Sequence, residues 1–220
     1  MKRETYTLET WRDIYKDRSC AIVGRGYSRR ELSFDKLKQF KSAGGVVIGV
    51  NHTVKKECKW RKYLDIHCFS DNLIPVDLKD DINSFPGIVW TIKAEWSNPV
   101  HGIDHLSYAV GKDSGYDFEP KKNIIWINHT CSFFALNLMY IAGCNPIYLT
   151  GIDLRLPPSG SNIYDDNFGR RISGLSYLPL LEGQRPGFEL ASKKAKQDGI
   201  NIYRTSNFST LDCFEVKDLQ

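Results

Sequence analysis

Short runs of hydrophobic residues, each bounded by polar residues, glycine or proline, recur along the whole chain. Seven of them have the length and composition of buried β-strands: residues 19–24, 46–50, 65–69, 87–92, 123–127, 147–150 and 200–203. Between them, Ser33 can cap a helix that stops at Gly44, and residues 128–143 combine a polar helix start, an apolar helix and a glycine stop. Strands that alternate with helices predict an α/β fold, with a Rossmann-like, mostly parallel, doubly wound sheet.

Three stretches of the chain lack a regular hydrophobic period. Residues 1–18 are polar and aromatic, which predicts a lead-in helix or arm. Residues 95–122 carry proline, glycine, aspartate and aromatic residues and are interpreted as a loop-rich insertion. Residues 154–185 form a long polar stretch rich in glycine and proline, and a loop of that length is typical of a lid or a binding loop.

The end of the chain returns to a regular pattern. Pro186 suits the first turn of a last helix, which Gly199 would end before the final strand. The length of 220 residues fits a single α/β domain over residues 1–220, in which residues 155–185 are the lid or loop insertion.

Small or polar residues follow five of the predicted strands. In an open parallel sheet, ligands bind outside the carboxyl ends of the strands, so a polar rim at this edge predicts a nucleotide site. The helix that begins near Thr130 and Ser132 adds free backbone N–H groups and a partial positive charge, which suit phosphate. The strand-end residues are Gly24, Asn51, Ser70 with Asp71, Asn128, and Gly151 with Asp153.

The sequence Gly24-Arg-Gly-Tyr-Ser28 follows the first strand. Glycine lets the backbone approach a ligand, so this loop is interpreted as a phosphate loop or, alternatively, as an ordinary tight turn. Arg29 replaces the third glycine of a dinucleotide fingerprint and Asn51 replaces its acidic residue, which disfavours a dehydrogenase. Arg25, Arg29 and Arg30 could neutralise phosphate or simply form a solvated basic loop.

Several side chains at this rim have both a chemical and a structural interpretation. Asn51 can recognise a base or ribose, or cap the chain. Asp71 and Asp153 can hold Mg²⁺ or a ribose hydroxyl, or form turns and helix caps. His129 can act as a general base or contact phosphate, or serve only at the helix start.

Arginines and tyrosines gather in the long segment after Asp153. They could close over an anionic donor as a lid, or lie on a solvated surface loop. The residues concerned are Arg155, Arg170, Arg171, Arg185, Tyr164 and Tyr177.

Composition narrows these alternatives only modestly. The formal net charge of +4 fits an anionic small molecule and gives no strong nucleic-acid signal. None of the six cysteines forms a CxxC pair, so we expect reduced, mostly buried thiols. His101 and His105, the only closely spaced histidines, lack a zincin glutamate, so no metal site is assigned.

No apolar run has the length of a transmembrane helix or of a signal-peptide core. We therefore expect a cytoplasmic protein, with peripheral contact to the inner membrane left open. Homo-oligomerisation is left open as well.

The glycine loop at residues 24–28, the strand ending in Asn51, the segment 128–143 and the Tyr-Leu-Thr-Gly-Ile-Asp run at residues 148–153 resemble bacterial lipooligosaccharide sialyltransferases. They also resemble a related family of phage and bacterial proteins that includes an archaeal 6-hydroxymethylpterin diphosphokinase. The resemblance covers about residues 19–155 and implies a Rossmann-like sheet that binds a nucleotide, which is a CMP-sugar in the sialyltransferases.

The resemblance also implies which residues contact the nucleotide, and the polar rim extends that set. The sialyltransferases carry a histidine base before their last helix, whereas this chain has no histidine after His129. Tyrosines that help the departing phosphate in that family are replaced by Leu154 and Arg155, and Arg155 could meet the same electrostatic need. The expected nucleotide-binding residues are Gly24, Gly26, Ser28, Asn51, Ser70, Asp71, Asn128, Thr130, Ser132 and Gly151.

The sequence therefore predicts a nucleotide-binding transferase, foremost a glycosyltransferase that moves a sugar from a nucleotide-sugar donor to a glycan or other small acceptor. Arg155 would stabilise the leaving group, and His129, Asp71 and Asp153 are the candidates for the general base. One alternative is a diphosphokinase-like enzyme in which Asp71 or Asp153 holds Mg²⁺ between ATP phosphates. The other is a nucleotide-binding protein without catalytic activity.

Overall fold

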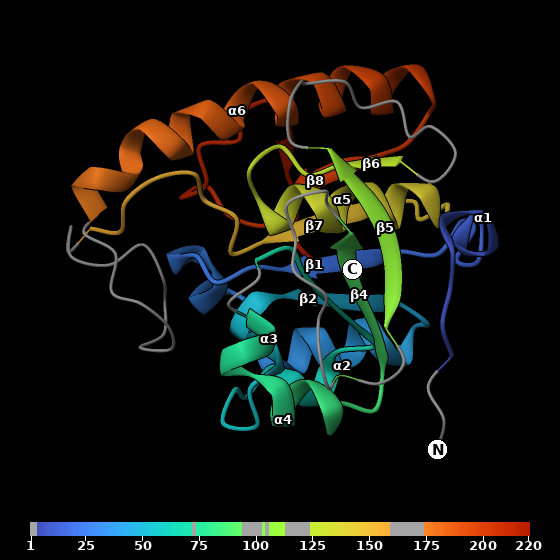
Figure 1. Cartoon of the computed structure of the whole chain (residues 1–220). Helices are drawn as coiled ribbons and strands as arrows, with labels where there is room; N and C mark the ends of the chain where they lie inside the picture. The colour runs from blue at the N-terminus through green and yellow to red at the C-terminus, as the bar shows by residue number, and fades with distance from the viewer. Residues whose placement is uncertain (1–3, 72–73, 94–102, 104–105, 113–123, 159–173) are drawn as a thin grey trace.

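A nine-stranded, all-parallel β-sheet runs through the protein, and helices cover both of its faces (Figure 1). The structure is a computed structural model that describes residues 4–71, 74–93, 103, 106–112, 124–158 and 174–220. The strands are β1 (Cys20–Val23), β2 (Val46–Val50), β3 (Ile66–Phe69), β4 (Ile88–Lys93), β5 (Ser107–Lys112), β6 (Ile124–Trp126), β7 (Ile147–Thr150), β8 (Ile202–Arg204) and β9 (Glu215–Val216).

The helices divide between the two faces of the sheet, with α2, α3 and α4 on one side and α5 and α6 on the other (Figure 1). The α-helices are α1 (Leu8–Trp11), α2 (Phe34–Ser42), α3 (Ile74–Asp77), α4 (Lys79–Asn83), α5 (Cys131–Ile141) and α6 (Gly174–Gln197). Short 3₁₀ helices are η1 (Tyr27–Glu31), η2 (Asn51–Val54) and η3 (Arg61–Tyr63).

The strand order reverses direction once, between β1 and β7. The order across the sheet is β6-β5-β4-β3-β2-β1-β7-β8-β9, so the chain builds outward from β1 in one direction and then restarts on the other side with β7. Val23, the last residue of β1, pairs with Gly49 of β2 and with Thr150 of β7. The carboxyl ends of these strands therefore meet at a topological switch point, where open α/β sheets bind ligands.

The central strands are buried along their full length, as their continuous apolar sequences predict. Helix α5 is buried on nearly all sides because it lies between the sheet and α6, where Phe133 of α5 packs edge-on against Phe188 of α6 at a ring distance of 5.2 Å. The six cysteines form no disulfide in this structure and all except Cys213 are buried, which confirms the expectation of mostly buried thiols.

The N-terminal arm, residues 6–17, closes the far end of α5. Trp11 is fully buried and donates its indole N–H to the carbonyl of Leu138 at 2.9 Å. Beyond it, the backbone N–H groups of Asp13, Tyr15 and Asp17 donate to the carbonyls of residues 141, 142 and 143 at 2.8–3.0 Å. A helix end leaves its last carbonyls without intrahelical partners, and the arm supplies them here.

The predicted elements agree with the structure in the first half of the chain, and three predictions in the remainder are wrong. Strand β5 lies within the predicted loop-rich insertion, and strand β9 follows the strand that we expected to be final. Residues 174–185 were expected to be part of a loop but belong to α6, and Pro186 lies inside this helix instead of at its first turn. Residues 159–173 of the predicted lid lie outside the described residues.

A helical signal was present in α6 despite its prolines. Its buried side chains recur every three or four positions, which is the spacing of one helix face: Leu181, Gln184, Phe188, Ala191 and Ala195. Gly183, Pro186 and Gly187 interrupt the sequence between them and suggested a loop.

Gly24 should tolerate no side chain, since a Cβ there would lie 2.3 Å from the carbonyl oxygen of Gly151, a backbone atom at the switch point. We expect Gly24→Ala to lower the free energy of unfolding by about 3 kcal/mol in urea titrations. The control is Gly183→Ala, because a Cβ at this helical position meets nothing within 4 Å. That variant should be neutral or up to about 1 kcal/mol more stable, and equal losses for both variants would contradict the crowding argument.

Candidate functional site

The loops after β1 and β7 cross in direct backbone contact at the switch point. Gly24 N–H donates to the carbonyl of Thr150 at 2.8 Å, and Gly26 N–H donates to that of Gly151 at 2.7 Å. Gly151 has φ of 65°, a left-handed conformation that suits glycine. Gly24 and Gly26, which we interpreted as residues that let the backbone approach a ligand, thus let the two loops approach each other. This agrees with the alternative interpretation of the segment as a tight turn.

Asp153 fixes this crossing through both of its carboxylate oxygens. The backbone N–H of Ser28 donates to Oδ2 at 2.9 Å, and the hydroxyl of Ser28 donates to Oδ1. The side chain is 6% exposed, and burial raises the pKa of the Asp153 carboxyl, while the two hydrogen bonds from Ser28 act in the opposite direction. The arrangement favours a positioning role for Asp153.

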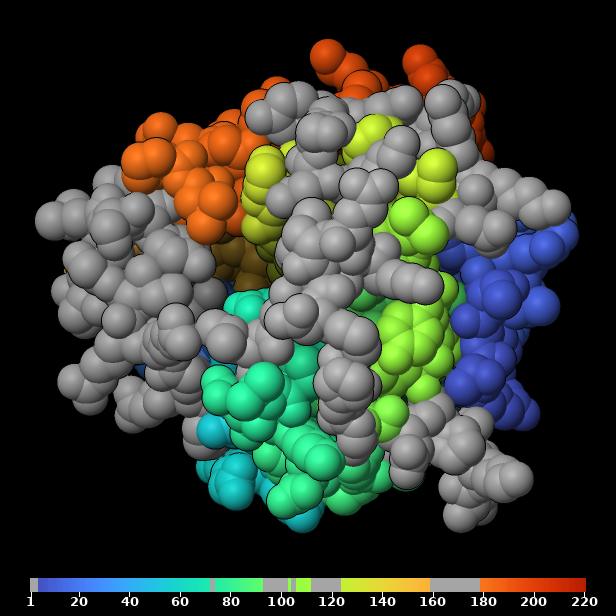
Figure 2. Space-filling model, viewed as in Figure 1, coloured from blue at the N-terminus to red at the C-terminus, as the bar shows by residue number. Residues whose placement is uncertain are grey.

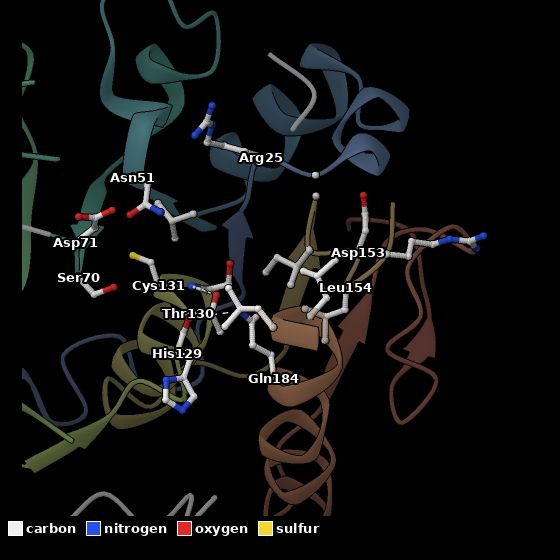
Figure 3. A pocket seen from close by; sticks show the side chains of 18 residues that line it. Arg25, Asn51, Ser70, Asp71, His129, Thr130, Cys131, Asp153, Leu154 and Gln184 are labelled. Carbon is white, nitrogen blue, oxygen red and sulfur yellow. Dashed lines mark hydrogen bonds between the residues drawn. The ribbon is translucent and has the colours of Figure 1, made fainter. Parts of the chain in front are cut away.

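A pocket of about 220 Å³ opens beside the crossing, at the carboxyl edge of the sheet (Figure 3). Its walls come from the loops after β1, β2, β3 and β7, from the first turn of α5 and from one turn of α6. The lining residues are Arg25, Gly26, Val50, Asn51, Ser70, Asp71, His129, Thr130, Cys131, Ser132, Gly151, Ile152, Asp153, Leu154, Arg155, Leu180, Leu181 and Gln184.

Most of the residues that the sequence singled out come together in this pocket. Those that line it are Gly26, Asn51, Ser70, Asp71, His129, Thr130, Ser132, Gly151, Asp153 and Arg155. Gly24, Ser28 and Asn128 are not among the lining residues and support the pocket from behind. Sequence reasoning missed Leu180, Leu181 and Gln184, because they belong to the part of α6 that was expected to be a loop.

Arg25 places a buried positive charge in the pocket wall. Its side chain is 5% exposed, and its Nη1 lies 3.0 Å from Nδ1 of His52. A guanidinium is charged at any physiological pH and can make paired hydrogen bonds to phosphate oxygens. Of the three arginines near the glycine loop, Arg25 is the one that lines the pocket.

Asn51 offers an amide to the same space from the end of β2. Its side-chain oxygen is buried and has no hydrogen-bond partner among the described residues. A buried acceptor without a partner costs free energy, so a ligand donor at this position would be favourable. Asn51 also has φ of 51°, a conformation that asparagine tolerates better than most residues.

Hydrogen bonds join the opposite wall to α6. Asn128 Nδ2 donates to the carbonyl of Gln184 at 3.0 Å, and Gln184 Nε2 donates to the carbonyl of His129 at 3.3 Å. A Cβ on Gly187 would lie 1.9 Å from Asn128 Nδ2, so glycine is required for this contact. Asn128 thus anchors the start of α5 to α6.

Backbone strain is concentrated around the pocket. Besides Asn51, positive φ values occur at Asn128 (43°), His129 (56°) and Leu154 (47°). A non-glycine residue in this region costs about 1 kcal/mol or more and persists only where the surroundings enforce it. Such strain often marks functional sites, and at His129 and Leu154 it turns the chain sharply at the pocket wall.

Helix α5 points its N-terminus into the pocket. Thr130 caps the helix by accepting a hydrogen bond from the backbone N–H of Ser132 at 3.3 Å. Thr130, Cys131 and Ser132 all line the pocket. The partial positive charge of this helix end adds to that of Arg25, so the part of the pocket that they line suits an anion, whereas Asp71 and Asp153 bring carboxylates to other parts of its wall.

Arg155 lines the pocket, but its guanidinium is engaged by Phe208. Its guanidinium lies over the ring of Phe208 at 4.6 Å, and Nη1 donates to the carbonyl of Phe208 at 3.4 Å. Arg185 donates to the carbonyl and hydroxyl of Thr210. Both arginines thus bind the segment that follows β8. Tyr164, Arg170, Arg171 and the side chain of Tyr177 lie outside the described residues.

The described residues contain neither a candidate metal cluster nor a candidate membrane-spanning helix. No cluster of three or more histidine, cysteine, aspartate or glutamate side chains among the described residues is arranged to hold a metal ion. His101 and His105 lie outside these residues. None of the described helices is long and apolar enough to span a bilayer.

Comparison with solved structures identifies the fold. The sialyltransferase CstII from Campylobacter jejuni in complex with the substrate analogue CMP-3FNeuAc matches with a TM-score of 0.53 and 14% sequence identity, covering 92% of this chain and 87% of that one. The same sialyltransferase in complex with a trisaccharide acceptor and CMP matches with a TM-score of 0.53 and 13% identity over the same shares. No protein-family model and no curated protein matches the sequence.

This likeness confirms the predicted Rossmann-like α/β fold and its similarity to sialyltransferases. At 13–14% identity the likeness is one of fold. The chemistry must be argued from the pocket itself.

Because the pKa of Asp153 is raised, its contribution to the free energy of unfolding depends on pH. Because folding raises this pKa, the contribution of Asp153 to stability is present below the ordinary carboxyl pKa of about 4 and is lost as the pH rises through the raised value. We expect Asp153→Asn, which can still bond both Ser28 groups, to match or exceed the wild-type stability at neutral pH. In acid this advantage should disappear.

Urea titrations at the two pH values measure the difference. Asp153→Ala serves as the comparison, because it leaves the Ser28 groups without partners and should cost about 1–3 kcal/mol. A neutral-pH loss in Asp153→Asn as large as that in Asp153→Ala would show that the negative charge itself stabilises the fold.

Proposed function

We propose that the chain is a glycosyltransferase that binds a nucleotide-activated sugar, such as a CMP-sugar, in the pocket at the switch point. The observation that carries the proposal is the gathering of Arg25, Asn51 and the start of α5 around one polar pocket. A sugar nucleotide needs a cation and N–H donors for its phosphate and a polar amide for its base or ribose. These groups are supplied here by different strand ends.

The fold supports the same proposal. The sialyltransferase of similar fold was solved with CMP and with a trisaccharide acceptor, so this architecture can hold a nucleotide and a glycan together. In our proposal the donor lies along the carboxyl ends of β1, β2 and β7, and the acceptor approaches from the open side of the pocket.

Charge stabilisation of the leaving nucleotide is assigned foremost to Arg25. A preorganised positive charge in a partly dehydrated site stabilises developing negative charge better than an exposed one. Arg25 is buried at the pocket, whereas the exposed Arg155 lies on Phe208. A role for Arg155 in the same step would require its side chain to leave that ring when the donor binds.

The general base is assigned to His129 among the three candidates. Asp153 is engaged by Ser28, whereas His129 and Asp71 are exposed residues that line the pocket. A neutral imidazole has one ring nitrogen with a free lone pair, which can accept a proton from an acceptor hydroxyl. In Figure 3 the ring of His129 points away from Arg25 and Asn51, which places it on the side from which we propose the acceptor approaches.

Nucleotide binding by Arg25 can be tested by thermal shift with CMP, CMP-sugars, UDP-sugars, GDP-sugars and ATP, each with and without Mg²⁺. A ligand that binds only the folded state raises the melting temperature. We expect a sugar nucleotide to do so, and Arg25→Met to weaken its binding about 10- to 100-fold, the value of one or two hydrogen bonds to a charged group.

The matched control is Arg30→Met. Arg30 is exposed and lies over the ring of Tyr27, outside the pocket, so its variant should bind the nucleotide normally. Stabilisation by ATP only in the presence of Mg²⁺ would favour the diphosphokinase-like alternative with Asp71 as a metal ligand. If no nucleotide stabilises the protein at millimolar concentration, the proposed donor site is wrong.

The catalytic assignment of His129 can be tested separately from binding. We expect His129→Gln to lower kcat for sugar transfer, or for slow hydrolysis of the donor, about 100-fold or more, because a general base contributes at least that factor. The nucleotide-induced thermal shift should remain. Asp71→Asn is the comparison, and a larger fall in kcat in that variant would transfer the assignment to Asp71.

A further inference from the structure

One short segment of the chain has a high density of positive charge. Residues 55–62, called the basic segment below, contain five lysines or arginines and one glutamate. Their formal charge of +4 equals the formal net charge of the whole chain, so the remaining residues are formally neutral. This asymmetry is invisible in the overall composition, which suggests only a mildly basic protein.

The backbone of the basic segment is fixed against α4. The N–H of Lys56 donates to Oδ1 of Asp81 at 2.9 Å, and the guanidinium of Arg61 donates to the carbonyl of Asp81 at 3.2 Å and to the hydroxyl of Ser84 at 3.1 Å. Asp81 therefore holds the segment near both of its ends. In Figure 2 the segment, in cyan, lies at the lower end of the molecule with α3 and α4.

Three lysines project from this fixed backbone. Lys56, Lys59 and Lys62 are exposed, and none of them forms a salt bridge within the described part of the chain. The ammonium of Lys62 lies 5.0 Å from the centre of the Tyr63 ring. The three charges are therefore available to an external anion.

The lysines border a groove of about 440 Å³ with an apolar side. The exposed residues Phe34 and Pro86 contribute to it, so apolar atoms lie at the surface between the positive charges. The groove is lined by Phe34, Lys56, Glu57, Cys58, Lys59, Arg61, Lys62, Leu64 and Pro86. It shares no lining residue with the pocket at the switch point.

We propose that the basic segment, with Phe34 and Pro86, is a docking surface for the anionic phospholipid headgroups of a bilayer. Lysine is a compact point charge that needs no particular acceptor geometry, and several of them beside apolar atoms suit a surface of phosphate groups and glycerol backbones. The inference is independent of the proposed function, since it uses a different part of the molecule.

The aromatic side chains of the surface argue against single-stranded nucleic acid as the partner. Base recognition uses aromatic faces and arginine planes on which bases stack. Phe34 instead packs on Trp60 with tilted rings at a distance of 4.5 Å and stacks with Tyr63 at 5.8 Å. Arg61 is bonded to Asp81 and Ser84. Their ring faces and the guanidinium are occupied by one another and by Asp81 and Ser84, which leaves the lysines and the exposed apolar atoms of Phe34 and Pro86 as the available contacts.

Vesicle co-sedimentation of the full chain tests the proposal. We expect binding to vesicles of phosphatidylcholine with phosphatidylglycerol, little binding to phosphatidylcholine alone, and weakening by salt. A cation near an anionic bilayer contributes about fivefold to partitioning. The variant Lys56→Ala/Lys59→Ala/Lys62→Ala should therefore bind anionic vesicles about 100-fold more weakly, with an unchanged melting temperature because the three side chains are exposed.

A second triple variant controls for net charge. Lys16, Lys193 and Lys196 are exposed lysines outside the groove, and their triple alanine variant has the same formal charge as the first. It should bind anionic vesicles within a few-fold of wild type. Equal losses in both triples, equal binding to neutral vesicles, no binding to either vesicle, or tighter binding to single-stranded oligouridylate than to anionic vesicles would each overturn the proposal.

The nucleotide thermal shift separates this proposal from the proposed function. Both triple variants should keep any shift that the wild type shows, because the altered residues lie outside the pocket. Loss of that shift in the groove triple would mean that the lysines act on the pocket, which contradicts a separate docking surface. Vesicle binding without any nucleotide shift would support the docking surface while refuting the transferase proposal.

Discussion

The candidate site depends on one steric constraint, the backbone contact between the loops that follow β1 and β7. Gly24 and Gly26 donate to carbonyls at the end of β7, at distances that leave no room for a side chain. Asp153 then binds Ser28 across the same crossing. These bonds join the two loops at the point where the strand order reverses. The backbone that carries Arg25 and Asn51 is therefore held in place beside the pocket.

The sequence predicted the central fold well because buried parallel strands are almost purely apolar. It failed at β5, where buried Ser107 and Ala109 alternate with exposed Tyr108 and Val110 and the apolar run is only three residues long, from Tyr108 to Val110. It also failed at the start of α6, where glycine and proline mask the helical spacing. Because that part of the helix was not predicted, Gln184 was not recognised as a pocket residue. Its position depends on a hydrogen bond to Asn128, which is distant in the sequence.

The residue types at the strand ends could be read from the sequence, but their partners could not. Asp153 was interpreted as a ligand for Mg²⁺ or a ribose hydroxyl, as a candidate base, or as a turn or cap residue, and the structure pairs it with Ser28, which lies 125 positions away. Arg25 and Arg155 have the same side chain and both line the pocket, and only the fold shows that Arg25 is buried whereas Arg155 is exposed and lies over Phe208. The residue types of the site could therefore be predicted from the sequence, whereas their contacts with distant residues could not.

The N-terminal arm has a consequence for any altered form of this protein. Backbone N–H groups of the arm donate hydrogen bonds to the last carbonyls of α5, and the opposite end of the same helix lines the pocket. Shortening the chain past Trp11 would leave the carbonyl of Leu138 without its indole donor and open the buried space that Trp11 fills, and shortening it past Asp17 would also expose the carbonyls of residues 141–143. A truncation or fusion that disturbs this arm would thus act on the helix whose first turn lines the pocket at the switch point, at the opposite end of that helix from the arm's own contacts.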